Sequence, residues 1–170
     1  MKVKAVDYAH DGRGVVKTGK DLVFVPNLMI GEEAEITITS NKKNYSIGEV
    51  KNYLSLSKER VTPPCMYYQQ CGGCQLQHMT YEHQLQMKQK RVSDALKHIA
   101  KLYVPVDDII KSTSPFEYRN KIQMAFANTK DGLIAGFYQA KTKKVLNINT
   151  CLIEHEEGNQ VIQTLKTLLD

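Results

Sequence analysis

The residues best suited to chemistry are four cysteines with uneven spacing. Cys65, Cys71 and Cys74 lie together in the stretch CMYYQQCGGCQLQH (65–78), whereas Cys151 lies far along the chain. Thiolates gathered at this density are ligands for a soft metal centre. Structural zinc sites usually combine two Cys-x2-Cys knuckles, and only one such pair is present. Three cysteines in one loop with a distant fourth favour an iron–sulfur cluster, with zinc and unligated thiols as alternatives.

Two histidines and two glycines bear on this choice. His78 and His155 each follow a cysteine by four positions, so either one could complete a mixed zinc site. We interpret both as structural or surface residues, because four cysteines already form a complete tetrahedral set. Gly72 and Gly73 would let the backbone approach a cluster and donate N–H groups to its sulfides. Because Cys151 must return to the loop, we expect the centre to act first as a structural staple.

Length and composition exclude several classes of protein. The chain has 170 residues, enough for one domain of ordinary size or two small ones. No apolar run approaches the roughly 20 residues of a membrane span, and the start, MKVKAVDYAH, lacks the apolar core of a secretory signal. We therefore predict a cytoplasmic protein with no membrane partner. In that reducing compartment, cysteines are expected to be metal ligands or catalytic thiols before disulfides.

Positive charge is concentrated in the middle of the chain. The formal net charge of +5 divides into +2 over residues 1–60, +6 over residues 61–150 and −3 over residues 151–170. The middle segment is therefore the best candidate for a surface that binds a polyanion. A solvated basic face explains the same charge equally well.

Residues 1–57 show short apolar stretches separated by turn signals such as Gly19 and Gly31. Apolar residues alternate with polar ones, for example, at Ala34, Ile36 and Ile38. About five short strands in so short a segment predict a small closed barrel of the OB type. Such barrels commonly bind single-stranded nucleic acid, although some are inert adaptors. Pro63-Pro64 then marks a boundary.

The rest of the chain combines helices with strands, so the predicted fold class is mainly β with some α (α+β). A helix is expected over residues 80–102, with Thr80 as its N-cap. Its predicted buried stripe comprises Tyr81, Leu85, Val92, Leu96, Ile99 and Tyr103. Residues 118–150 return to antiparallel strands. A last helix should begin near Asn159, and its uncapped end indicates that the natural protein continues.

Five segments carry a resemblance to a family of RNA-modifying enzymes. They are GRGVVKTGKDLVFVPNLMIGEEAEI (12–36), RVTPPC (60–65), CGGCQLQH (71–78), EYRNKIQMAF (117–126) and GFYQAKTKKVLNINTC (136–151). In these segments the chain resembles the RNA uracil-C5 methyltransferases that carry an N-terminal TRAM domain and a [4Fe-4S] cluster. These are the RumA-like enzymes that act on 23S ribosomal RNA. The combination of RVTPPC, CGGCQLQH and YRNK with a closing cysteine is highly specific.

The resemblance implies a division of labour along the chain. Residues 1–57 match the TRAM domain, an OB-type barrel that helps to hold RNA. Residues 60–155 match the small α+β domain that binds the iron–sulfur cluster. Residues 156–170 match the start of a linker helix to a methyltransferase domain that this chain lacks. By position, the family's four cluster ligands correspond to Cys65, Cys71, Cys74 and Cys151.

The reaction that the resemblance implies is the formation of 5-methyluridine. A uridine is flipped out of its stack, a cysteine thiolate adds to C6, C5 takes a methyl group from S-adenosylmethionine, and a base removes the C5 proton. The missing domain binds S-adenosylmethionine and supplies that cysteine. This sequence has no glycine-rich loop between a strand and a helix, and its cysteines are all assigned as ligands. We therefore expect it to position ribosomal RNA and to be inactive alone.

Two other interpretations stay open. The chain could be a free-standing RNA-binding module with a structural metal site and no catalysis, which is what the literal 170-residue chain would be. The uncapped last helix favours a part of a longer enzyme instead. A weaker alternative is a small zinc-ribbon protein with a redox or scaffold role, which metal analysis and a visible spectrum would distinguish.

We predict that the chain is a monomer. We also predict that two groups of residues contact RNA. They are Arg119, Asn120 and Lys121 in one segment, and Lys42, Lys43 and Tyr45 on the barrel. The run Tyr118-Arg119-Asn120-Lys121 offers an aromatic face, a forked donor, an amide and a point charge, which can stack a base and hold phosphate. In the structural alternative, Tyr118 belongs to the core and Arg119 pairs with an acid such as Glu117.

Overall fold

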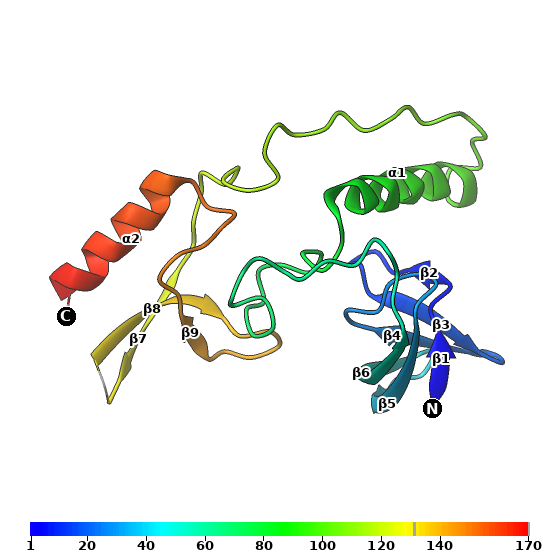
Figure 1. Ribbon diagram of the computed structural model, residues 1–170, viewed down its shortest axis with the longest axis horizontal. Coiled ribbons are helices and arrows are strands. Elements are labelled where there is room, and N and C mark those ends of the chain that lie inside the picture. The colour runs from blue at the N-terminus through cyan, green and yellow to red at the C-terminus, as the bar shows by residue number, and fades with distance from the viewer. Residues whose placement is uncertain (131, 170) are drawn as a thin grey trace. The chain divides into compact units, whose positions relative to one another are not determined.

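The computed structural model describes residues 1–130 and 132–169, with the backbone alone at 169 (Figure 1). The chain divides into two compact units. The barrel unit comprises Met1–Thr62 and His78–Ile109, and the cysteine unit comprises Pro63–Gln77 and the chain from Ile110 onward. This division differs from the boundary expected at residues 57–60, because the first helix belongs to the barrel unit. Within the described residues, no helix has the length and hydropathy that a membrane span requires.

Over the described residues the fold is mainly β with two helices, as the predicted α+β class requires. In the barrel unit the elements are β1 (Lys2–Lys4), β2 (Asp7–Tyr8), β3 (Gly14–Thr18), β4 (Asp21–Val25), β5 (Glu33–Asn41), β6 (Ser46–Ser55) and α1 (Tyr81–His98). In the cysteine unit they are β7 (Ala125–Thr129), β8 (Gly132–Tyr138), β9 (Val145–Asn147) and α2 (Glu156–Leu169).

The first sheet closes on itself. Its strand order is β1-β5-β6-β4-β3-β2, and β1 and β2 are two halves of one segment. β1 pairs antiparallel with β5, whereas β2 pairs antiparallel with β3, so this segment joins both edges of the sheet. β4 and β6 run parallel, and the other pairs are antiparallel. This pairing is that of a small OB-type barrel, and Figure 1 shows its strands in blue to cyan.

The barrel encloses an apolar core. Its buried members are Val3, Ala5, Val16, Val23, Val25, Leu28, Ala34 and Ile36. Each fully buried valine, leucine or isoleucine stabilises the fold by roughly 1.5–3 kcal/mol relative to an exposed one. Gly14 is required where β3 passes the chain at Leu28, because a Cβ there would lie 2.4 Å from the Leu28 carbonyl oxygen.

A buried ion pair ties the end of the barrel to the chain that follows it. The Glu32 side chain is fully buried and accepts hydrogen bonds from Arg60 Nε and Nη2, each at 2.6 Å. The backbone N–H groups of Met29 and Ser57 donate to the same carboxylate at 2.9 and 3.1 Å. Burial alone would raise the pKa of Glu32, but these donors outweigh it and hold that pKa below its usual value. The Arg60 guanidinium also lies 4.7 Å from the Tyr53 ring centroid.

Helix α1 begins where the sequence predicts and packs on the barrel through polar contacts. Thr80 is its N-cap, and the Thr80 hydroxyl accepts a hydrogen bond from the His83 backbone N–H at 3.3 Å. The Tyr8 hydroxyl lies 2.8 Å from His83 Nε2. Arg91 Nη1 donates to the His10 carbonyl at 2.9 Å. The helix ends at His98, before the predicted residue 102.

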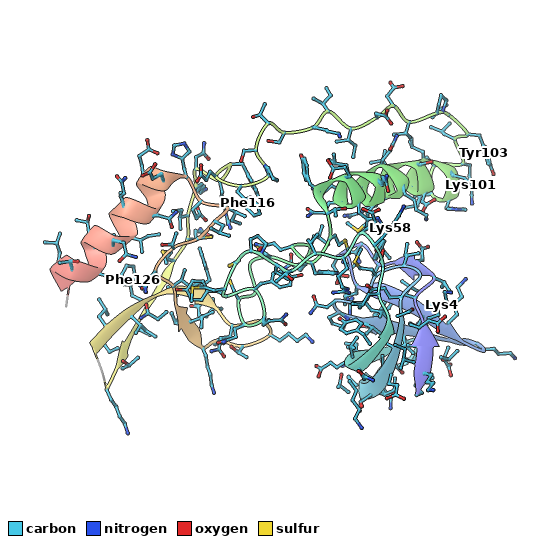
Figure 2. The ribbon with its side chains drawn as sticks, in the orientation of Figure 1. Lys4, Lys58, Lys101, Tyr103, Phe116 and Phe126 are labelled. Atoms are coloured by element: carbon cyan, nitrogen blue, oxygen red, sulfur yellow. The ribbon has the colours of Figure 1, made fainter. Side chains whose placement is uncertain are left out.

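The predicted apolar stripe of this helix is wrong beyond its first turns. Leu85 is buried, but Val92 is 50% exposed and Ile99 is 82% exposed. Tyr103, labelled in Figure 2 past the end of α1, is 79% exposed. The 3.6-residue period is present, but the contacts of α1 with the barrel through His83 and Arg91 are polar, and the apolar residues near the end of the helix are left in solvent.

The cysteine unit contains an antiparallel sheet in the order β7-β8-β9 and the helix α2. The α2 helix begins at Glu156, slightly before the predicted start. It packs against the chain near Ile122, because a Cβ at Gly158 would lie 2.6 Å from Ile122 Cδ1. Lys166 Nζ donates to Asn147 Oδ1 at 2.6 Å and so ties the helix to the end of β9. Phe126, on β7 in Figure 2, is exposed.

Candidate metal centre

The cysteine loop is shaped by its own turns and by attachment to the sheet of the same unit. The Cys71 N–H donates to the Tyr67 carbonyl at 2.8 Å. The Gly72 N–H donates to the Tyr138 carbonyl at 3.1 Å, and the Ala140 N–H donates to the Gln70 carbonyl at 3.0 Å. A Cβ at Gly72 would lie 3.3 Å from the Tyr138 carbonyl oxygen, tighter than most real contacts. The glycine therefore permits the loop to pair with the chain that leaves β8.

All four cysteines line one cavity, which we call the cysteine pocket. Its cavity volume is about 30 Å³, and it is partly open to solvent. Its other lining residues are Tyr67, Tyr68, Gly73, Gln77, Arg119, Phe137, Ile148, Leu152 and Ile153. The structure thus brings Cys151 back to the loop that holds Cys65, Cys71 and Cys74, and all four are free thiols. Among the described residues, no three Cys, His, Asp or Glu side chains are grouped closely enough to hold one metal ion.

Cys151 is positioned by helix α2. The Cys151 N–H donates to Asn159 Oδ1 at 2.8 Å, and Asn159 Nδ2 donates to the Cys151 carbonyl at 3.1 Å. One amide side chain therefore holds both backbone polar groups of this cysteine. Sequence reasoning missed this role. The available signal was an asparagine near the start of the predicted last helix, eight residues after Cys151.

The thiols of the pocket influence one another. Burial raises the pKa of Cys74, the nearby Cys71 and Cys65 raise it further, and Gln77 and Arg119 oppose the increase. Burial also raises the pKa of Cys151, with a smaller contribution from Cys74. These raised pKa values favour the protonated thiols of Cys74 and Cys151, and a metal that binds them would have to displace their protons.

A second buried carboxylate lies beside the pocket. Glu154 is 0% exposed, and no described group lies within hydrogen-bond distance of either carboxylate oxygen. Arg119 Nε lies 3.6 Å from Glu154 Oε1, and the Arg119 side chain is 41% exposed. The backbone holds the pair in register, because the Arg119 N–H donates to the Ile153 carbonyl and the His155 N–H donates to the Arg119 carbonyl. Burial raises the pKa of Glu154, and Arg119 opposes the increase.

The two histidines weighed as zinc ligands lie elsewhere. His78 belongs to the barrel unit, where burial, with Arg60 as a further contributor, lowers its pKa to about 4. His155 is exposed and contacts Glu157. Of the described residues that line the cysteine pocket, none is a histidine.

The three predicted RNA contacts that follow Tyr118 differ in solvent exposure. Asn120 and Lys121 are exposed. Arg119 lines the cysteine pocket instead of lying free on the surface. The structural alternative is wrong about Tyr118, which is 64% exposed and not part of the core. Its expectation that Arg119 pairs with an acid is confirmed, although the acid is Glu154 and not Glu117.

On the barrel, Lys42, Lys43 and Tyr45 are exposed in the turn between β5 and β6. Tyr45 meets Phe24 edge to face, with ring centroids 5.1 Å apart. The Arg13 guanidinium lies 4.9 Å from the Phe24 centroid on the same ring. Sequence reasoning missed Arg13 and Phe24, although Phe24 alternates with the core residues of β4 and must point outward.

Comparison with known proteins defines the first part of the chain. Residues 2–51 match the TRAM domain family, and these residues form the closed barrel described above. The chain therefore carries a TRAM domain.

Longer relatives extend the relationship to nearly the whole chain. An uncharacterized RNA methyltransferase of Halalkalibacterium halodurans is 41% identical over 169 residues, which cover 99% of this chain and 37% of the relative. Proteins of the same description from Listeria innocua and Bacillus cereus are 40% and 42% identical, each over 96% of this chain and 36% of the relative. The chain is thus homologous to part of the TRAM-containing proteins named RNA methyltransferases, and it spans little more than a third of their length.

Proposed function

We propose that this chain is the RNA-positioning part of an S-adenosylmethionine-dependent 23S ribosomal RNA uracil-C5 methyltransferase, and that it holds a [4Fe-4S] cluster. The observation that carries the proposal is the convergence of four cysteines on one pocket, in a chain whose relatives are named RNA methyltransferases. The TRAM domain supports the RNA-binding part. Uracil-C5 specificity rests on the resemblance of the RVTPPC, CGGCQLQH and YRNK segments.

The residues of the cysteine pocket fit an iron–sulfur cluster. Four thiolates are the usual ligand set of a [4Fe-4S] centre. A single zinc ion needs all four sulfurs about 2.3 Å from one point, whereas the ligands of a cluster attach to separate iron atoms around a larger body. Cysteines that line the walls of a cavity suit the second arrangement. When bound to Cys65, Cys71, Cys74 and Cys151, the cluster would supply a cross-link between the loop and the chain before α2.

The barrel offers a surface suited to single-stranded RNA. Phe24 and Tyr45 present aromatic rings, Arg13 lies over one of them, and Lys42 and Lys43 add charge beside them. Base stacking on aromatic side chains is worth about 1–3 kcal/mol per base, and the positive charges would hold the phosphates. Asn120 and Lys121 are proposed as a further contact in the cysteine unit.

The chain's own residues would bind and orient RNA, not perform methyl transfer. Its four cysteines are all assigned to the cluster, so none is left as the nucleophile that attacks C6. We propose that the nucleophile and the S-adenosylmethionine site belong to a domain outside this sequence. We further propose a monomeric, cytoplasmic protein, in which free thiols would stay available for metal.

Two measurements test the proposal. Protein purified without oxygen in iron-rich medium should be brown and contain about four irons per chain. Stoichiometric zinc in that preparation would contradict the cluster. The chain should also bind single-stranded RNA with strong salt dependence and show no saturable binding of S-adenosylmethionine in calorimetry. A failure to bind RNA at low salt would contradict the RNA-positioning role.

A further inference from the structure

The Arg119–Glu154 pair differs from an ordinary salt bridge because one side chain is partly exposed and the other is fully buried. Glu154 is fully buried, and no described group donates a hydrogen bond to its carboxylate. A buried carboxylate without hydrogen bonds is costly, and the Arg119 guanidinium at 3.6 Å offsets only part of that cost. The arginine side chain faces this carboxylate and also lines the cysteine pocket.

The geometry of Arg119 leaves donors available to the pocket. Its backbone is fixed on both sides by the pairing with residues 153 and 155. Its Nε–H donates to the Lys121 carbonyl at 3.2 Å. No described residue accepts a hydrogen bond from its terminal amino groups. A guanidinium held in this way can donate to a sulfur in the pocket without moving its backbone.

We propose that Arg119, held by Glu154, is a positioning residue of the metal centre that compensates its negative charge and sets its reduction potential. The inference rests on the proposed [4Fe-4S] cluster. Four thiolate ligands leave such a cluster with net negative charge, and nearby positive charge and N–H donors to sulfur both favour the reduced form. Arg119 therefore serves the cluster and not RNA phosphate, while the exposed Lys121 serves RNA.

The test compares two neighbouring cations that should act on different properties. Anaerobic wild-type protein, R119Q and K121Q are each titrated with dithionite and redox mediators, while electron paramagnetic resonance follows the one-electron reduced cluster. R119Q should shift the midpoint potential to a more negative value, and K121Q should leave it unchanged. In RNA-binding assays the order should reverse, with K121Q weakening binding more than R119Q.

A conservative variant guards against loss of the cluster. R119K keeps the positive charge but lacks the forked donor, so its potential should lie between those of wild type and R119Q. If R119Q loses its iron, the shift of R119K relative to wild type decides the question. E154Q removes a negative charge beside the arginine and should shift the potential in the opposite direction to R119Q.

The failures of the two proposals are distinguishable. A wild-type protein with zinc and no iron defeats the proposed cluster. A wild-type protein with a normal cluster, in which R119Q and R119K keep the wild-type potential, overturns the role of Arg119 alone. Weaker RNA binding by R119Q at an unchanged potential would return Arg119 to the RNA surface and would also overturn the inference.

Discussion

Each unit of this protein buries one glutamate completely beside an arginine, and the two pairs are built differently. Glu32 accepts hydrogen bonds from Arg60 at 2.6 Å and from two backbone N–H groups. Glu154 has its arginine at 3.6 Å and no described hydrogen-bond donor. The Arg60 side chain is 16% exposed, whereas that of Arg119 is 41% exposed.

The difference separates a structural pair from one that faces a cavity. The hydrogen bonds to the Glu32 carboxylate all come from its own unit, so the pair anchors the chain after β6 to the barrel and needs no ligand. The Glu154–Arg119 pair is incomplete and borders the pocket of the four cysteines. A buried, incompletely paired charge beside a cavity is typical of a functional site, so it marks the cysteine pocket as a candidate binding site.

The largest expected effect is on the satisfied pair. Substituting Arg60→Met leaves the Glu32 carboxylate buried without its cation and should lower the free energy of unfolding of the barrel unit by about 3–5 kcal/mol. Amide hydrogen exchange of β5 and β6 measures that loss. The matched change Arg119→Met should cost less, because the Arg119–Glu154 contact at 3.6 Å is longer than the Arg60–Glu32 hydrogen bonds, and because Glu154, whose pKa burial already raises, can take up a proton. Equal losses in both variants would remove the distinction between the pairs.

Removal of the proposed cluster should destabilise the cysteine unit and not the barrel unit. If the proposed cluster is bound, a chelator that removes it should lower the free energy of unfolding around residues 65–77 and 149–153 by about 2–4 kcal/mol, the scale of closing a long loop with a cross-link. Cys151→Ser should reproduce the loss, and hydrogen exchange in the barrel strands should stay unchanged. Protection lost equally in β3–β6 would show that the centre is not confined to the cysteine unit.

A fall in pH should lower the stability of the barrel unit, because His78 is protonated more readily in the unfolded chain. Its folded pKa of about 4 lies below the unfolded value of 6.5, so the unfolded chain binds more protons between these values. Stability is therefore fully present above pH 6.5 and falls by about 1.4 kcal/mol per pH unit as the pH drops toward 4. Urea unfolding of the barrel unit at pH 7 and pH 5 measures the slope. In His78→Gln the slope over this window should disappear, whereas a slope that persists would point to another group.

The smallest expected effect concerns the barrel surface. Tyr45→Ala should weaken binding of a single-stranded RNA by about 1 kcal/mol, at the lower end of the range for one stacked base. The loss should not depend on salt, because stacking releases no counterions. Fluorescence anisotropy at two salt concentrations measures both quantities. As a control, Lys43→Gln should reduce the salt slope, and an identical response of the two variants would contradict separate roles.

Local features of the fold were predictable from the sequence, and features set by distant contacts were not. Thr80 as an N-cap and the strand alternation around Ile36 follow from neighbouring residues alone. The exposure of Ile99 does not, because a periodic stripe specifies a face but not what covers it. The Glu32–Arg60 pair joins residues 28 positions apart, which no local pattern reveals.

The candidate site divides in the same way. The cysteines could be chosen from their type and spacing, since few other patterns place three thiols in one short loop. The roles of Asn159 and Glu154 depend on a helix and a strand pairing, which bring Asn159 to Cys151 and Glu154 to Arg119. Arg119 could be chosen as a candidate from the YRNK motif, and its pairing with an acid could be foreseen, but the partner Glu154 could not be identified without the fold.

The way the barrel closes also affects the order in which it can form. Residues 2–8 leave the ribosome before both of their partners, β3 and β5, and they join the two edges of the sheet. Until β5 emerges, the nascent chain exposes an unpaired strand edge, which is a site for pairing with other chains. Closure of the barrel is therefore a late step in synthesis that depends on long-range contacts. A chain truncated before β5 should aggregate when it is translated and should not form a partly folded barrel.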